Sequence, residues 1–212
     1  MKGMKSGDNR GFTLIEMAIV LVIIGIIIGA VVKGQDLVDN AKSKQFASKL
    51  QAWQIALNTY YDRKGRYPGD DDRNGIIASG GTLTPLEDIN SARFDSPPEA
   101  TFTIGGAAFT ASLGNDGGTT PRNYLAITKS TVATYDPTNS ADRAALKYFE
   151  AYDTAIDGSA DPTQGQVVGA TGATIAAGAK LTALTVATTP TVWMDGASAP
   201  TPVFEALALQ IK

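Results

Sequence analysis

An uninterrupted apolar run near the N-terminus constrains this chain more than any other feature. Phe12 to Val32 is 21 residues long and contains one ionisable side chain, that of Glu16. At about 1.5 Å of rise per residue, a helix of this length spans a hydrocarbon core of about 30 Å. The run therefore predicts a transmembrane helix. It follows a leader, residues 1–11, whose three basic and one acidic side chains favour a cytoplasmic N-terminus.

Glu16 is unusual in such a run, because a carboxylate in hydrocarbon costs roughly 2.5–3.5 kcal/mol on insertion scales. Cleavage between Gly11 and Phe12 would create an α-amino group one helical turn from Glu16. A neighbouring copy shifted along the helix axis could then place its own amine opposite this carboxylate. Alternatively, Glu16 lies near the end of the span and reaches the headgroups. In the first case, charge compensation drives assembly.

Two other interpretations of the N-terminus are a secretory signal peptide and an uncleaved signal anchor. A secretory signal peptide also has a basic region before an apolar one, but its apolar region is usually about 7–15 residues long and a small-residue cleavage site follows it. Here the run is longer, and Val31-Val32-Lys33-Gly34 leads directly into a polar segment. An uncleaved signal anchor stays open as an alternative.

The order of residues around Gly11 resembles a known processing site. This stretch consists of a basic leader, Gly11, then Phe12-Thr13-Leu14-Ile15-Glu16 and an apolar segment. It is similar to the cleavage and methylation site of type IV prepilins and type II secretion pseudopilins. The resemblance implies a prepilin peptidase that cuts after Gly11 and methylates the Phe12 amine. It also implies a filament in which Glu16 of one subunit meets the amine of another.

The same resemblance implies partners and a location. The partners are copies of the chain, other pilins or pseudopilins, the inner-membrane assembly platform and membrane lipid. The precursor would cross the bacterial inner membrane once, with its N-terminus cytoplasmic, before entering an extracytoplasmic filament in the periplasm or on the cell surface. Major pilin, minor pilin and pseudopilin are not separated by this sequence. Lys33 stands where many major pilins have a proline.

Gly25 and Gly29 form a GxxxG pair within the apolar run. This spacing lets transmembrane helices approach closely. The resemblance further implies that the segment can lose helicity in a filament, which Gly25, Gly29 and Gly34 would ease. The alternative is that these glycines are only tolerated in a lipid-facing helix.

The helical pattern continues beyond the apolar run. Apolar side chains recur at spacings of 4, 3, 4 and 3, which places them on one helix face. They are Phe46, Leu50, Trp53, Leu57 and Tyr60. Because no proline occurs between Phe12 and Lys64, we expect one helix of about 53 residues that ends at Gly65. The stripe should pack on the chain's own head; a coiled-coil seam to a partner is the alternative.

We therefore expect an α+β fold, with a long protruding N-terminal helix packed on a mainly antiparallel sheet, as the resemblance also implies. The expected parts are a cleaved leader (1–11), the membrane and assembly half of the helix (12–32), its amphipathic half (33–65) and a globular head (66–212). In the head we predict strands at Thr101–Leu113 and Tyr124–Tyr135 forming a hairpin, a helix at Ala141–Ala155, and two or three strands within Gln166–Met194 with Trp193 in the core. At Thr201–Lys212 we predict a helix, with an edge strand as the alternative.

A hydrophilic turn after the long helix carries a candidate metal site. Asp70, Asp72 and Asn74, followed by Gly75, reproduce the first half of a calcium loop, D-x-D-x-N-G. The twelfth position, where such loops have a bidentate glutamate, is Gly81. The pattern predicts a calcium site; the alternative is a solvated turn held by Asx-type hydrogen bonds.

Composition excludes several functions. The chain has no cysteine and no histidine, which removes disulfides, Ser-His and Cys-His catalysis and ordinary zinc sites. Residues 66–212 hold nine basic and sixteen acidic side chains, so the acidic head is a poor ligand for nucleic acid. Glu87 and Glu99 have no visible nucleophile partner, so we expect no enzyme. The sequence favours a filament subunit; the alternative is a monomeric, membrane-anchored binding module with an acidic extracytoplasmic head.

Overall fold

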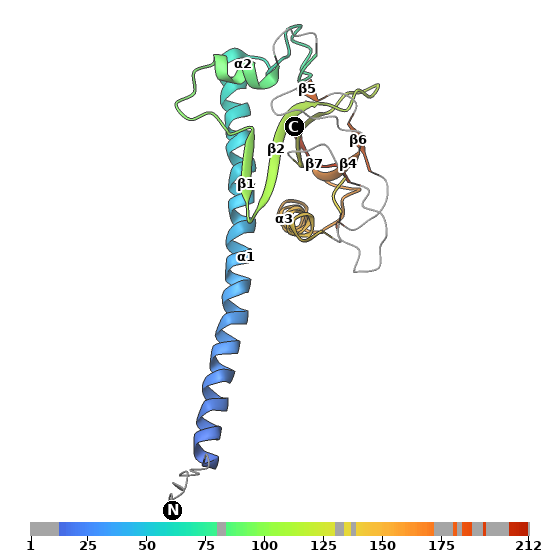
Figure 1. Cartoon of the computed structure of the whole chain (residues 1–212). Helices are drawn as coiled ribbons and strands as arrows, with labels where there is room; N and C mark the ends of the chain where they lie inside the picture. Colours follow the sequence, from blue (N-terminus) through green and yellow to red (C-terminus); the bar gives the residue numbers. More distant parts are fainter. Residues whose placement is uncertain are drawn as a thin grey trace, which may run out of the picture. The chain divides into compact units, whose positions relative to one another are not determined.

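The computed structural model describes residues 13–79, 84–129, 134–136, 139–171, 180–181, 184–187, 193 and 204–211. Within these residues the chain has an α+β fold (Figure 1). Its elements are α1 (Leu14–Lys64), α2 (Pro85–Ser91), β1 (Thr101–Ile104), β2 (Ala107–Asn115), β3 (Asn123–Lys129), α3 (Ser140–Asp157), β4 (Val167–Thr171), β5 (Lys180–Leu181), β6 (Thr185–Val186) and β7 (Ala206–Ile211). The chain divides into two compact units, Met1–Ala41 and Lys42–Lys212, and α1 contributes to both.

Helix α1 confirms the long N-terminal helix predicted from the sequence. It extends over 51 residues from Leu14 to Lys64, and Phe12 lies outside the described residues. Gly65 ends it: this residue has a φ of 66° and donates its N–H to the carbonyl oxygen of Tyr61 at 2.7 Å. A left-handed residue after the last turn is a common helix stop, and glycine adopts it without steric cost.

The second half of α1 supplies the centre of the head's core. The predicted stripe is confirmed, because each of its members is at most 1% exposed: Phe46, Leu50, Trp53, Leu57 and Tyr60. The centroid of the Phe46 ring lies 5.3 Å from the ring centroid of Phe109 and 5.6 Å from that of Phe149. Since this stripe is buried within its own unit, it cannot form a coiled-coil seam with a partner.

One sheet organises the head. Six strands follow one another in the order β1-β2-β3-β7-β4-β6, all antiparallel, and β5 pairs with β2 in parallel. One face of the sheet packs against α1 and α3 (Figure 1), in a cluster that includes Phe109, Ile127 and Leu207. The other face forms a second cluster around Tyr124 and Val168. The mainly antiparallel α+β architecture is thus as expected.

The predicted strand at 101–113 is two strands. Gly105 and Gly106 have φ values of 58° and 86° and form the turn between β1 and β2, in which Ile104 pairs with Ala107. Positive φ at both central residues is the two-residue hairpin turn that matches strand twist. The hairpin predicted between 101–113 and 124–135 is confirmed as β2 and β3. However, β3 ends at Lys129, and Tyr135 belongs to no strand.

The helix predicted at Thr201–Lys212 is wrong. The described part of this segment, 204–211, contains strand β7, which pairs with β3 on one side and β4 on the other and is therefore not an edge strand either. Leu207 and Leu209 enter the cluster beneath α1, and Ala206 and Ala208 enter the cluster on the opposite face. A strand buried on both faces has apolar residues at every position, so the helical spacing of a few large side chains was misleading. Thr201 and Pro202 lie outside the described residues.

The remaining elements largely agree with the sequence. Helix α3 confirms the helix predicted at Ala141–Ala155; Asn139 caps it by accepting a hydrogen bond from the Ala141 N–H at 2.9 Å. Strands β4, β5 and β6 confirm the prediction for 166–194, and Trp193 is 3% exposed in the core. Helix α2 was not predicted, although Thr84 and Glu87 form a capping box and proline opens the helix.

Candidate functional site

Thr13 and Glu16 form a closed hydrogen-bond pair at the start of α1. The Glu16 carboxylate Oε2 accepts from the Thr13 N–H at 2.7 Å and from the Thr13 hydroxyl at 2.9 Å. The Glu16 N–H in turn donates to Thr13 Oγ1 at 3.3 Å. This is the reciprocal arrangement of a capping box, with threonine at the cap and glutamate three residues later. The acid is therefore satisfied by its own chain, a pairing that was not predicted from the sequence.

The first half of α1 exposes a continuous apolar surface. Leu14, Leu21 and Ile26 are 92%, 69% and 68% exposed, and Glu16 is the only ionisable residue between Thr13 and Val32. Among the described residues, α1 is the single helix that is long and apolar enough to cross a membrane, judged by length and composition. An apolar surface of this extent is typical of a membrane span or of an interface with other chains.

Gly25 and Gly29 lie four residues apart on this exposed part of α1. A Cβ atom built on either glycine would meet no other atom within 4 Å, so neither is required by packing inside the chain. Positions four apart share one helix face, and the absence of side chains leaves a shallow groove between them. The geometry thus permits a close helix–helix approach, which stays a prediction. Gly11 and Phe12, the predicted processing residues, lie outside the described residues.

The predicted calcium residues are brought together in one loop. Asp70 is 1% exposed, and its carboxylate accepts backbone hydrogen bonds from Asn74 and Gly75, each at 3.0 Å. The Asp72 carboxylate accepts from the Asn74 side-chain amide at 2.8 Å. Asp70 therefore shapes the loop by holding the backbone four and five residues further on. The Asx turn in this loop belongs to Asn74, whose side-chain oxygen accepts from the Ile76 N–H at 2.8 Å. Asp72 and Asn74 lie beside each other and are exposed.

Ser79 joins this loop, although it was not predicted from the sequence. Its hydroxyl oxygen lies 2.9 Å from each of three acceptors: Asp72 Oδ1, Asn74 Oδ1 and the carbonyl oxygen of Ile76. One hydroxyl carries one hydrogen, so it donates to one of these acceptors at a time. The Ser79 hydroxyl is the leading cause of the lowered pKa of Asp72. The loop thus gathers more oxygen acceptors than donors. In the described part of the chain, no group of three or more acidic side chains is arranged to hold a metal ion.

A buried ion pair fixes the same loop to α2. Arg66 donates to both oxygens of Asp88, at 2.7 and 3.1 Å, and the Gly69 N–H donates to Asp88 at 2.8 Å. Burial opposes ionisation of Asp88, but these hydrogen bonds and the Arg66 charge outweigh it, so the pKa of Asp88 is lowered. The pair therefore orders the loop independently of any cation.

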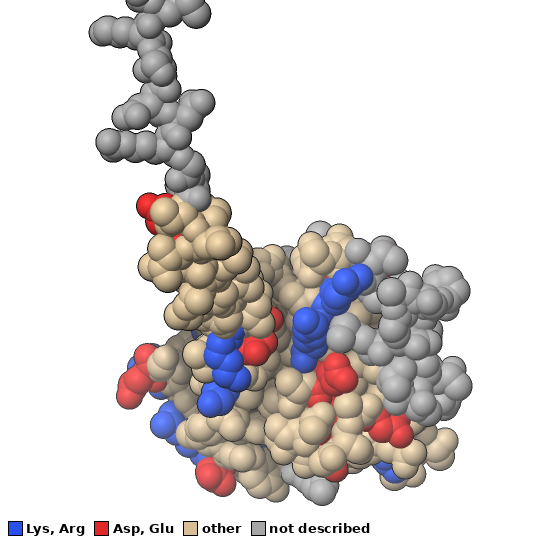
Figure 2. Space-filling view, turned by 90° about the horizontal axis from the view of Figure 1, so that it is seen from below, with Lys and Arg blue, Asp and Glu red and all other residues tan. Residues whose placement is uncertain are grey.

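Glu87 and Glu99, the two acids considered in the sequence as catalytic candidates, are not part of a catalytic arrangement within the described residues. Glu87 caps α2, and Glu99 forms an ion pair with Lys49 at 2.6 Å. On the face shown in Figure 2, basic and acidic side chains are interspersed and do not form a basic stripe. Both acids thus have structural roles, and this face lacks the continuous positive surface of a nucleic-acid site.

These features define an α+β protein whose N-terminal helix has an exposed apolar half with a single acid near its start. Residues 7–32 match the family model of the prokaryotic N-terminal methylation motif, the signature of type IV prepilins and pseudopilins. The motif indicates a pilin-like or pseudopilin-like protein. No curated protein and no solved structure is significantly similar to the chain.

Proposed function

We propose that the chain is a structural subunit of a type IV pilus or of a filament resembling the type II secretion pseudopilus. The observation that carries this proposal is the methylation motif at residues 7–32, which runs into a helix whose apolar side chains are exposed in its first half. A helix of 51 residues, of which the second half forms the head's core, supports it further. The subunit has no enzymatic role in this proposal.

Processing precedes assembly. A membrane-embedded prepilin peptidase cuts after Gly11 and methylates the new amine of Phe12. The basic leader keeps the N-terminus in the cytoplasm until the cut, by the positive-inside rule. The precursor therefore crosses the bacterial inner membrane once, with its head on the extracytoplasmic side.

Glu16 then changes its partner. In the separate chain its carboxylate is held by Thr13 at 2.7 and 2.9 Å, which lowers the cost of placing the acid near the membrane. In the filament the carboxylate meets the Phe12 amine of a neighbouring subunit, and the exposed apolar faces with Gly25 and Gly29 pack together. The partners are copies of the chain, other pilins or pseudopilins and the inner-membrane assembly platform, with membrane lipid around the span. The acidic head argues against nucleic acid as a partner.

The mature N-terminus tests the processing step directly. We expect mass spectrometry of the protein from a host with the peptidase to find a chain that begins at Phe12 with one methyl group. A variant with a bulky residue at the cut, Gly11→Leu, should retain the leader, because the peptidase site requires a small residue there. An intact Met1 in the wild-type protein from such a host would contradict the proposal.

Calcium binding by the loop of Asp70, Asp72, Asn74 and Ser79 is part of the proposed function. The surplus of oxygen acceptors around Ser79 supports it, since hard cations take carboxylate, amide, hydroxyl and carbonyl oxygens. Because only two carboxylates contribute, we expect affinity in the millimolar range. The cation would stabilise the junction between α1 and the head.

A thermal titration tests the calcium proposal. We expect the melting temperature of the wild-type chain in detergent to rise by a few degrees in millimolar calcium, because a ligand of the native state stabilises it by mass action. Asp72→Asn should remove most of this rise, whereas Asp71→Asn, a neighbouring acid outside the cluster, should not. A wild-type melting temperature that millimolar calcium leaves unchanged would contradict the calcium proposal.

A further inference from the structure

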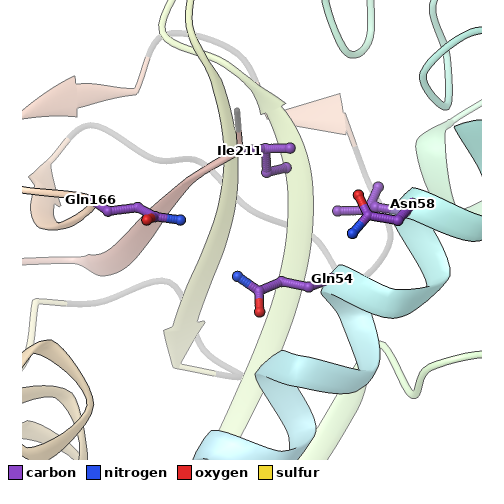
Figure 3. A pocket seen from close by; sticks show the side chains of 5 residues that line it. Gln54, Asn58, Gln166 and Ile211 are labelled. Atoms are coloured by element: carbon purple, nitrogen blue, oxygen red, sulfur yellow. The ribbon is translucent and has the colours of Figure 1, made fainter. Parts of the chain in front are cut away.

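A pocket lined by uncharged amides lies between α1 and the sheet. Its volume is about 270 Å³, and its walls come from Gln54, Leu57 and Asn58 on α1, Gln166 just before β4 and Ile211 at the end of β7. Figure 3 shows the side chains of Gln54 and Gln166 extending toward each other across this space. All five residues belong to the unit that contains the head, Lys42–Lys212.

The amides of this pocket have unused hydrogen-bonding capacity. Gln166 donates from Nε2 to the carbonyl oxygen of Gln210 at 3.2 Å, which fixes its side chain and leaves its own oxygen as an acceptor. Within the described residues, the side-chain amides of Gln54 and Asn58 have no hydrogen-bond partner. Each carboxamide offers an acceptor oxygen and two donor hydrogens. The pocket therefore presents donors and acceptors together, from two elements that the core holds in place.

Charge and shape restrict what can occupy the pocket. None of the five described residues that line the pocket is ionisable, so a charged ligand would lose hydration without meeting an opposite charge among them. Leu57 is buried and Ile211 partly buried, which adds an apolar floor. A volume of about 270 Å³ is at the lower limit of small-ligand sites, roughly 300–1,000 Å³. The ligand is thus small, neutral, rich in groups that both donate and accept, and partly apolar.

We propose that this pocket binds one neutral sugar unit. Each sugar hydroxyl donates and accepts one or more hydrogen bonds, which matches paired carboxamides better than it matches any charged group. The C–H face of the ring would lie on Leu57 and Ile211. A neutral glycan also approaches the acidic head without repulsion, unlike an anionic one. The pocket is open and contains no aromatic platform, so affinity for a single unit is in the millimolar range.

Saturation-transfer NMR on the full chain tests this assignment. The protein is held in a detergent without a sugar headgroup and mixed with neutral hexoses and N-acetylhexosamines, with glucuronic acid and glucosamine as charged probes. We expect transfer to at least one neutral sugar and not to the charged ones. Gln54→Leu and Asn58→Leu should each weaken this binding about tenfold, as loss of a hydrogen bond predicts.

Gln45→Leu is the matched control, because Gln45 is an exposed amide on the same helix but does not line the pocket. It should bind sugar as the wild type does, and all three variants should melt at the wild-type temperature. Absence of transfer to every neutral sugar would overturn the assignment. So would transfer that Gln54→Leu and Asn58→Leu leave unchanged.

Discussion

Replacing Glu16 with valine is expected to abolish filaments while leaving the subunit inserted in the membrane and cut after Gly11. The head does not depend on this residue, because its core begins at Phe46. Cleavage should persist, because the leader and Gly11 are unchanged. The measurements are filament yield by electron microscopy of sheared cells and the N-terminal mass of the membrane-bound subunit.

The size of the effect follows from the cost of an unpaired charge in an apolar interface. Without Glu16, the Phe12 amine of the neighbouring subunit has no counter-ion. An uncompensated charge at such a position costs roughly 2.5–3.5 kcal/mol, which weakens each contact by roughly 100-fold. A filament repeats this contact at every subunit, so the loss should be complete at ordinary expression levels.

Two matched variants separate charge pairing from helix capping. Glu16→Gln keeps an oxygen that can accept from the Thr13 N–H but removes the charge, so we expect it to fail as the valine variant does. Thr13→Val removes the hydroxyl of the capping pair but leaves the carboxylate, so filaments should form. If Glu16→Gln assembles normally and Thr13→Val does not, Glu16 acts as a helix cap and the filament proposal loses its mechanism. Filaments with retained function in the valine variant would favour a membrane-anchored binding module.

The N-terminal half of the molecule could be predicted from the sequence because its signals are long and local. The signals are an apolar run of 21 residues with a single acid, a seam from Phe46 to Tyr60 and a glycine stop at Gly65, and each acts through short-range geometry. The end of the chain could not be predicted in the same way. Whether residues 206–211 form a helix or a strand depends on β3 and β4, which lie far away in the sequence and cover both edges of β7.

The same distinction holds for the candidate site residues: some could be predicted from the local sequence, and others depend on the fold. Glu16 stands out in the sequence by itself, since a single acid in an apolar run is costly in hydrocarbon. The pairing of Thr13 with Glu16 was also within reach, because threonine followed three residues later by glutamate is a capping signature. The role of Ser79 could not be predicted from the sequence, because only the fold of the loop brings its hydroxyl to Asp72 and Asn74. The sugar pocket depends entirely on long-range contacts between α1, β4 and β7.

Asp153 provides the second large effect, through the pH dependence of the head's stability. This residue of α3 is fully buried; one carboxylate oxygen accepts from the Trp193 indole N–H at 2.7 Å and the other has no partner. Burial is the main cause that raises the pKa of Asp153 from 3.8 to about 6. The Trp193 bond opposes the rise, while the nearby carboxylates of Asp157 and Asp161 add to it.

The direction of the effect follows from proton linkage. The folded chain holds the Asp153 proton more tightly than the unfolded chain does, so protonation favours folding. This contribution is complete below pH 3.8 and is lost as the pH rises through about 6. Moving one pKa by this amount corresponds to at most about 3 kcal/mol, and to less where water screens the neighbouring charges. At neutral pH the head therefore carries an ionised acid that its core disfavours.

Asp153→Asn is expected to stabilise the chain at pH 7.5 by about 2–3 kcal/mol and to have little effect at pH 4. The asparagine can accept from Trp193 as the acid does, and its amide hydrogens can donate toward Asp157, as a protonated acid would. A chain of this size should then melt about 4–12 °C higher at pH 7.5. Glu150→Gln, which removes a partly exposed carboxylate from the same helix, is the control and should shift the melting temperature by less than about 2 °C at either pH.

Only the difference in stability between wild type and variant isolates Asp153, since Asp88 and Asp161 have lowered pKa values and lose stabilising charge in acid. If that difference is the same at both pH values, Asp153 is uncharged in the folded chain throughout or lies in water, and the burial argument fails.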